Sequence, residues 1–347
     1  MDTLISVTSD PVARYLTQRG AKYDRKNRMR PMSTGEMLDT ALRIYQRLGL
    51  TFLRMTVPAA LLCLAAVGFV QNYVAPDLFT TQGSGSGADV IGEVAAALAM
   101  AVFMGGPLLL LGWSYSSSLI VHLVSDYLLG NNPDPDAASQ TARAVLPRLF
   151  VVNLKELVLS VSGIVVSTLI MGVGGVIAKT SPDTDATAGV VTAIGVLAIL
   201  PGIFAFLYFA AHDALAAPVA VIEGARSREA SKRSRALLKR SGYHLGGTGT
   251  IWALYLLLTV IALVLEWGIY AFVLLLGIRD HLAALLSFLP GEALFLQAFD
   301  LAPSFLVIWT LVPVWASVVT IVYYERRVRL EGFDIDVLAS EITDENR

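Results

Sequence analysis

The chain has 347 residues, of which 55% are hydrophobic and 16% are charged. A soluble domain could not bury so much apolar surface, so the composition predicts an integral membrane protein. The net charge of -2 and the separation of basic from acidic segments disfavour a nucleic-acid partner. Cys63 is the single cysteine and lies in an apolar segment, which excludes an intrachain disulfide and a cysteine-based metal cluster.

Residues 1–32 are polar and basic and lack the apolar core of a secretory signal, so we expect a mobile cytoplasmic tail. Ser33 and Glu36 then have the spacing of a capping box, in which each side chain accepts a hydrogen bond from the other backbone N–H. A helix over 33–48 should follow and lie in the membrane interface, leading into a first span over 51–73. Its apolar face is formed by Met37, Ala41, Tyr45 and Leu48.

Further apolar segments are long enough to cross a bilayer. They cover residues 90–124, 151–178, 189–211, 250–277 and 304–324. A second surface helix is predicted over 135–148, with Asp134 as its cap and Pro135 at its first position. Gly163 and nearby glycines are expected to allow close packing of the third span. The segment 279–303 is too short for two spans, so we expect it to lie on the outer face or to re-enter the membrane.

Prolines interrupt the second, fourth and sixth spans at Pro107, Pro201 and Pro313. Each removes a backbone donor and clashes with the preceding turn, which predicts a bend in each of these helices. A glycine follows each proline after 23, 23 and 19 residues, where the chain leaves the membrane: Gly130, Gly224 and Gly332.

This spacing predicts an all-α fold of six transmembrane helices, arranged as three hairpins with cytoplasmic surface helices. The membrane domain would cover residues 33–330, with a cytoplasmic tail over 331–347. Three parallel pseudo-repeats would occupy about 33–130, 131–224 and 225–332. Because proline and glycine are common in membrane helices, chance coincidence stays the alternative.

The segment between the fourth and fifth spans carries seven cations, which predicts that it is cytoplasmic. They are Arg226, Arg228, Lys232, Arg233, Arg235, Lys239 and Arg240. Of the 26 lysines and arginines, only Lys179 and Arg279 fall on the opposite side, so both termini should be cytoplasmic.

Within this segment, Arg228, Lys232, Arg235 and Lys239 share one face of a helix predicted over 228–241. Ala230, Ser234, Leu237 and Leu238 form the opposite, weakly apolar face, and Ser227 occupies the expected cap position. We interpret this as a helix on the inner membrane surface that binds anionic lipid or a partner protein. The alternative is a solvated basic segment that only sets the topology.

Few polar residues lie in the predicted spans. Glu266 is far inside the fifth span without a basic neighbour, so it should face the bundle interior, either as a hydrogen-bonded lock between helices or in a functional role. His122 with Asp126, and His212 with Asp213, occur at inner span ends. A shared metal or proton site is conceivable there, but polar residues at helix ends are the simpler interpretation.

Three segments resemble a known family. SxGEMLDTALRIYQRLG over 33–49, PVAVIEGARSREASKRSRALLKRSG over 218–242 and YYERRVRLEGFDIDVLA over 323–339 are similar to bacterial multi-pass proteins grouped with the membrane domain of glycerophosphoryl diester phosphodiesterase. The resemblance implies a six-helix membrane module. The catalytic barrel of those phosphodiesterases has no counterpart in this chain, so their activity is not implied.

No pattern typical of a hydrolase, metalloprotease or phosphate-binding loop occurs. We therefore expect no catalytic site, cofactor or metal. The resemblance to bacterial multi-pass proteins implies a location in the bacterial plasma membrane. The leading hypothesis is a scaffold or accessory subunit whose surface helices contact lipids or a membrane or cytoplasmic protein. The alternative is a transporter or lipid-handling permease with a polar site near Glu266. A dry, closely packed interior would favour the first and an internal polar cavity the second.

Overall fold

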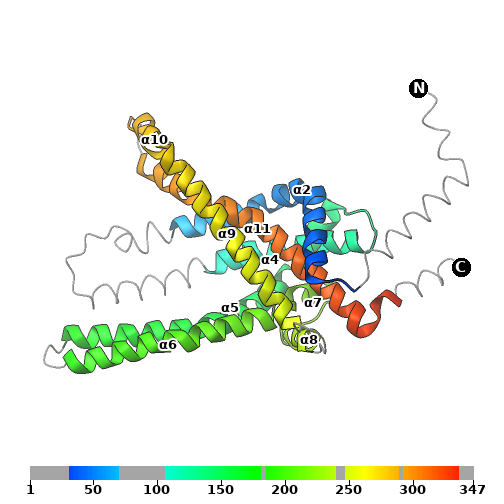
Figure 1. Cartoon of the computed structure of the whole chain (residues 1–347), viewed down its shortest axis with the longest axis horizontal. Coiled ribbons are helices and arrows are strands. Elements are labelled where there is room, and N and C mark those ends of the chain that lie inside the picture. Colours follow the sequence, from blue (N-terminus) through cyan, green and yellow to red (C-terminus); the bar gives the residue numbers. More distant parts are fainter. Residues whose placement is uncertain (1–30, 70–105, 181–184, 240–246, 289–291, 336–347) are drawn as a thin grey trace, which may run out of the picture.

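The computed structural model (Figure 1) describes residues 31–69, 106–180, 185–239, 247–288 and 292–335. All regular secondary structure within these ranges is helical, as predicted. Six of these helices are long and apolar enough to cross a membrane, as a multi-pass membrane protein requires. They are α2 (Thr34–Phe69), α4 (Gly106–Leu128), α5 (Pro135–Thr180), α6 (Asp185–His212), α9 (Gly247–Leu275) and α11 (Glu292–Glu331).

Three shorter helices connect or extend the long ones. They are α7 (Ala216–Ile222), α8 (Ser227–Lys239) and α10 (Ile278–Leu286). The predicted tail up to residue 30, the outer loop and first half of the second span within 70–105, and Arg240 lie outside the described residues.

Two helices begin as their sequences predict. The backbone N–H of Ser33 donates to Glu36 Oε2 at 2.8 Å and that of Glu36 donates to Ser33 Oγ at 3.3 Å, which confirms the capping box. The Asp134 side chain accepts from the backbone N–H of Asp136 at 3.0 Å, and Pro135 is the first residue of α5. These local contacts satisfy N–H groups that the first turn of a helix leaves without partners.

The cap predicted at Ser227 is wrong by one residue. Helix α8 already includes Ser227, and the carbonyl of Arg226 accepts the first helical bond from Ala230 at 2.8 Å. The Glu229 side chain then reaches back to the Arg226 N–H at 3.3 Å. The start therefore uses the acidic half of a capping box without the serine.

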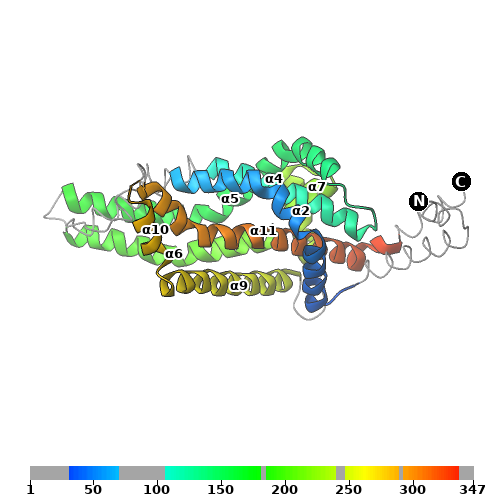
Figure 2. The same ribbon diagram turned by 90° about the horizontal axis from the view of Figure 1, so that it is seen from above.

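The predicted surface helices do not form separate elements from the spans that follow them. Residues 33–48 and the first span belong to the single helix α2, and residues 135–148 and the third span belong to α5. Figure 2 shows the first part of α2, in dark blue, turned sharply across the direction of the rest. Its predicted apolar face packs inward, with Met37 and Ala41 buried. Its orientation relative to a membrane stays a prediction.

The segment 279–303 is mostly helical. After the short helix α10, residues 292–303 already belong to α11, whose helix continues through Pro303 and Pro313. Arg279 forms a bidentate ion pair with Asp300, in which Nε lies 3.0 Å from Oδ1 and Nη2 lies 3.3 Å from Oδ2. This pair links α10 to the start of α11. The position of the segment on the outer face or within the membrane stays a prediction.

The long helices expose broad apolar faces. Leu197 on α6 is 68% exposed and Leu274 on α9 is 81% exposed, and many of their neighbours are similarly accessible. In contrast, α4 and the second half of α11 are mostly buried and lie inside the bundle. This distribution is typical of helices that face hydrocarbon outside and protein inside.

Two of the three predicted helix breaks lie fully within the described residues. Pro201 lies inside α6 and Pro313 inside α11, whereas Pro107 is the second residue described in α4, so its preceding turn lies outside the described residues. Gly130, Gly224 and Gly332 all have left-handed φ angles, of 77°, 69° and 67°. They end helices in a way that suits glycine. The internal repeat itself stays a prediction.

Helices α5 and α6 form the tightest pair and run side by side in both views (Figures 1 and 2). Their backbones meet at Gly163 and Gly202. A Cβ atom on Gly163 would lie 2.8 Å from the Cα of Gly202, and one on Gly202 would lie 2.9 Å from the carbonyl carbon of Gly163. The expected close packing at Gly163 is therefore present, with Gly202 as its partner.

We expect Gly163→Ala and Gly202→Ala each to destabilise the protein by about 1–3 kcal/mol, because the added methyl group meets backbone that cannot move aside. Apparent melting temperatures in detergent would measure this. Gly189→Ala is the matched control on α6, since a Cβ there meets nothing within 4 Å, and it should be neutral or stabilising. Equal effects of Gly202→Ala and Gly189→Ala would contradict the close contact.

Candidate functional site

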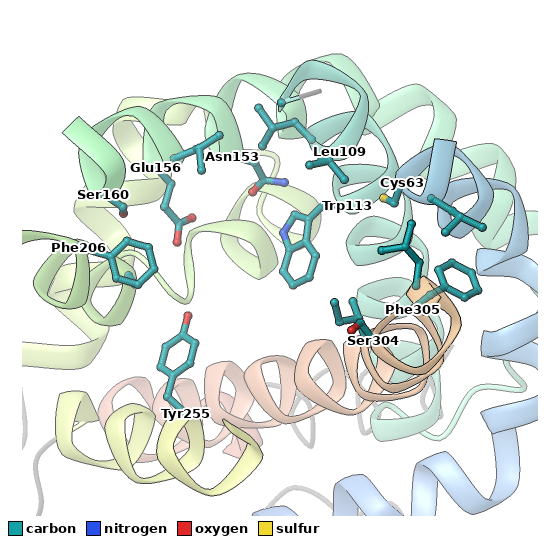
Figure 3. A pocket seen from close by; sticks show the side chains of 17 residues that line it. Cys63, Leu109, Trp113, Asn153, Glu156, Ser160, Phe206, Tyr255, Ser304 and Phe305 are labelled. Carbon is teal, nitrogen blue, oxygen red and sulfur yellow. The ribbon is translucent and has the colours of Figure 1, made fainter. Parts of the chain in front are cut away.

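The long helices form a partly open cavity of about 540 Å³ between them. Each of the six spanning helices contributes to its wall, and Figure 3 shows the lining side chains. Most of the wall is apolar, for example at Leu109, Phe206 and Phe305. A cavity of this size and lining falls within the range of small-molecule sites in proteins.

Three polar residues on α5 point into this cavity (Figure 3): Asn153, Glu156 and Ser160. Their spacing of three and four residues places them on one helical face. Asn153 donates from Nδ2 to Ser114 Oγ on α4 at 2.8 Å, so its amide is used to join two helices. Glu156, one turn further along, faces the space between α5, α6 and α9.

The Glu156 carboxyl has no hydrogen bond or ion pair with any other residue that the structure describes. The neighbouring Lys155 turns the other way and donates from Nζ to Ser231 Oγ on α8 at 2.9 Å. The hydroxyl of Tyr255 on α9 points toward Glu156 from the opposite wall (Figure 3). The Tyr255 ring packs on Trp315, with 4.1 Å between ring centroids, which fixes the hydroxyl in place.

Helix α8 is bound to the corner between α6 and α7 near this end of the cavity. Arg235 contacts both carboxylate oxygens of Asp213, at 2.9 and 3.1 Å, and Asp213 is only 1% exposed. Ser234 Oγ donates to the His212 carbonyl at 2.8 Å and accepts from the Leu215 N–H at 3.2 Å. The hydrogen bond to Asp213 raises the pKa of Arg235 above its ordinary value, so this cation stays charged throughout the physiological range.

The predicted basic face of α8 divides into two groups. Arg228, Lys232 and Lys239 are exposed and form no ion pair with the rest of the described chain. Arg235 is held by Asp213, and Arg233 forms ion pairs with Glu223, at 3.3 Å, and with Glu331 of α11. Arg226 is also exposed, and Arg240 lies outside the described residues. The opposite, weakly apolar face is buried within the protein, at Ala230, Ser234, Leu237 and Leu238.

The predicted intramembrane carboxylate, Glu266, is hydrogen-bonded to a neighbouring helix. Ser304 Oγ of α11 donates to Glu266 Oε1 at 2.6 Å, and Ser304 also lines the cavity. This is the geometry expected of a polar lock between helices.

The predicted histidine pairs do not converge on a metal-binding group. His212 bonds through Nδ1 to the Tyr208 carbonyl at 2.8 Å, and Asp213 is engaged by Arg235. His122 is partly buried, and its Nε2 has no hydrogen-bond partner among the described residues. Asp126 lies one turn further along α4. No group of three or more potential metal ligands is found in the described part of the chain.

Sequence reasoning missed Glu156 and a second polar cluster on α11. There Glu325 and Arg326 are buried, and Arg329 binds the Glu325 carboxylate one turn away. Tyr323 donates from its hydroxyl to Glu223 at 2.8 Å, which joins α11 to the end of α7. The sequence pattern that could have indicated Glu156 is the spacing of Asn153, Glu156 and Ser160, which places three polar residues on one face of a mostly apolar helix.

Comparison of the chain with protein-family models, with curated proteins and with solved structures found no match.

Arg235→Gln should destabilise the protein by about 1–3 kcal/mol, because it leaves the buried Asp213 carboxylate without a cationic partner. Lys232→Gln, three residues earlier on the exposed side of α8, is the control and should change stability little. Thermal unfolding in detergent would compare them. If both variants melt at the temperature of the native chain, the ion pair does not anchor α8.

Proposed function

We propose that the protein is a multi-pass protein of the bacterial plasma membrane that binds an amphipathic molecule, such as a lipid, in the cavity between its spanning helices. The supporting observation is the cavity of about 540 Å³ with a carboxyl group at one end. The sequence left a choice between a scaffold with a dry interior and a transporter or lipid-handling protein with an internal polar site. A cavity of this size departs from the closely packed interior of a scaffold, so we propose the lipid-handling alternative, with Glu156 in place of Glu266 as the polar group of a mostly apolar site.

The lining supports an amphipathic occupant. Apolar walls hold water poorly, because a water molecule needs two to four polar partners to be retained. Polar groups are concentrated on α5, at Asn153, Glu156 and Ser160, and on the facing Tyr255. An occupant with an apolar body and one polar group would satisfy both parts of the wall.

Tryptophan in place of Ala210, which lines the cavity on α6, should fill part of the space and weaken binding at least tenfold. The measurement is the amount of lipid or added amphiphile retained by protein purified in mild detergent. Ala193→Trp is the control, because Ala193 is exposed on the same helix. Retention by Ala210→Trp equal to that of the control would contradict a ligand in the cavity.

The exposed cations of α8 favour a second role at the membrane surface. In the proposed topology both termini and α8 are cytoplasmic, where Arg228, Lys232 and Lys239 would meet anionic headgroups or a protein partner. Binding of lipid or a partner protein by α8 would be a second function in addition to ligand binding in the cavity, and it requires no catalytic site.

Replacing Arg228, Lys232 and Lys239 together by Gln should weaken binding to anionic vesicles by about 1 kcal/mol per charge. Arg235 is left intact because its loss would disturb the contact with Asp213. Reconstituted protein or detergent-solubilised protein mixed with phosphatidylserine vesicles would provide the measurement, with phosphatidylcholine vesicles as the reference. If the triple variant binds anionic vesicles as well as the native chain does, the exposed cations of α8 do not bind lipid and act only in setting the topology.

A further inference from the structure

We propose that the cavity selects a lipophilic cation, whose positive centre lies between the Glu156 carboxyl and the aromatic ring of Phe206, with the Tyr255 hydroxyl opposite. The inference rests on the proposed function and adds the chemical class of the ligand. It follows from the charge of the wall, from the aromatic groups near the carboxyl and from the apolar far end.

The described cavity wall carries one carboxyl group and no basic side chain. Glu156 is the one ionisable acid on the described lining, and no lysine, arginine or histidine lines the space. Lys155 is adjacent in sequence, but its ammonium group is bonded to Ser231 on α8. Arg235 is neutralised by Asp213. An anionic ligand would therefore find no cationic partner on this wall, whereas a bound cation would stabilise the ionised form of the Glu156 carboxyl, since a charge in an apolar space requires a partner.

Aromatic side chains lie on the same part of the cavity wall as the carboxyl. Figure 3 shows the ring of Phe206 beside Glu156, the Tyr255 hydroxyl opposite and Trp113 projecting toward the middle of the cavity. The faces of aromatic rings attract cations, and the attraction is stronger where water is excluded. A carboxylate with several rings is thus complementary to an organic cation that is too large and too apolar to be strongly hydrated.

The other end of the cavity suits an apolar body. Its wall is formed by Leu109, Phe305 and Ile308, with the Ser304 hydroxyl committed to Glu266. A ligand that is charged at one end and apolar at the other would bury its apolar surface here.

The test compares ions of one shape and opposite charge. Tetraphenylphosphonium and tetraphenylborate would be titrated against the full-length protein in a neutral maltoside detergent, with triphenylphosphine oxide as an uncharged probe. The inference predicts that the phosphonium ion binds at least tenfold more tightly than the borate. This comparison uses the native chain and does not depend on the folding of a variant.

Glu156→Gln should weaken phosphonium binding at least tenfold and leave binding of the uncharged probe within about twofold, since the amide keeps the shape and loses the charge. Asp136→Asn is the control, because it removes an exposed acid from the same helix. It should bind all three probes like the native chain.

Failure of the inference can be separated from failure of the proposed function. If the uncharged probe binds and Ala210→Trp abolishes that binding, but the two ions bind equally, the cavity is a ligand site without selectivity for cations. Equal binding of phosphonium by the native chain and Glu156→Gln would also overturn the inference. If no probe binds, or Ala210→Trp changes nothing, both proposals fall.

Discussion

The burial of the second half of α11 is the constraint on which the rest of the bundle depends. Every residue from Ala316 to Arg326 is buried, and this part of the helix contacts its neighbours on several sides. Polar groups in such a place must find partners within the protein, because hydrocarbon supplies none. The hydroxyls of Ser317 and Thr320 bond to carbonyls one turn back on their own helix, and Tyr324 donates to Ser125 on α4 at 3.1 Å.

The cavity exists where this close packing ends. Its α11 wall is formed by residues 301–308, before the buried half of the helix, while its α5 wall carries Glu156. Next to it, Asp213 and Arg235 close the corner between α6 and α8. The end of the bundle that is densely packed and joined by hydrogen bonds therefore lies next to a cavity with mostly apolar walls. Such an arrangement can hold a binding group rigidly without filling the site with side chains.

The features that sequence reasoning obtained are local. The six spans follow from runs of apolar residues, and the caps at Ser33 and Asp134 follow from contacts within three residues. The buried face of α8 follows from helical periodicity. The internal continuity of α2 and α5 was missed because the change from an amphipathic to an apolar pattern was taken as a helix boundary, although a helix can bend without ending.

The site was missed because it is made by contacts between distant parts of the chain. Glu266 stood out by its apolar neighbours, whereas Glu156 follows Asn153 and Lys155 near the predicted start of a span and resembled a headgroup-region residue. Only the fold turns Lys155 toward α8 and Glu156 toward Tyr255, about a hundred residues later in the chain. Likewise, Arg235 could be placed on a basic face, but its pairing with Asp213 depends on the turn through α7.

The most direct test of a ligand-binding cavity uses the protein's own thiol. Cys63 is the single cysteine of the chain and lines the cavity on α2. The measurement is the rate at which a small uncharged maleimide modifies Cys63 in detergent, with and without saturating tetraphenylphosphonium. Occupancy of the cavity predicts a several-fold slower reaction in the presence of the ligand, with the native rate restored on its removal. An unchanged rate under conditions where the ligand is bound would place the ligand elsewhere and contradict the account.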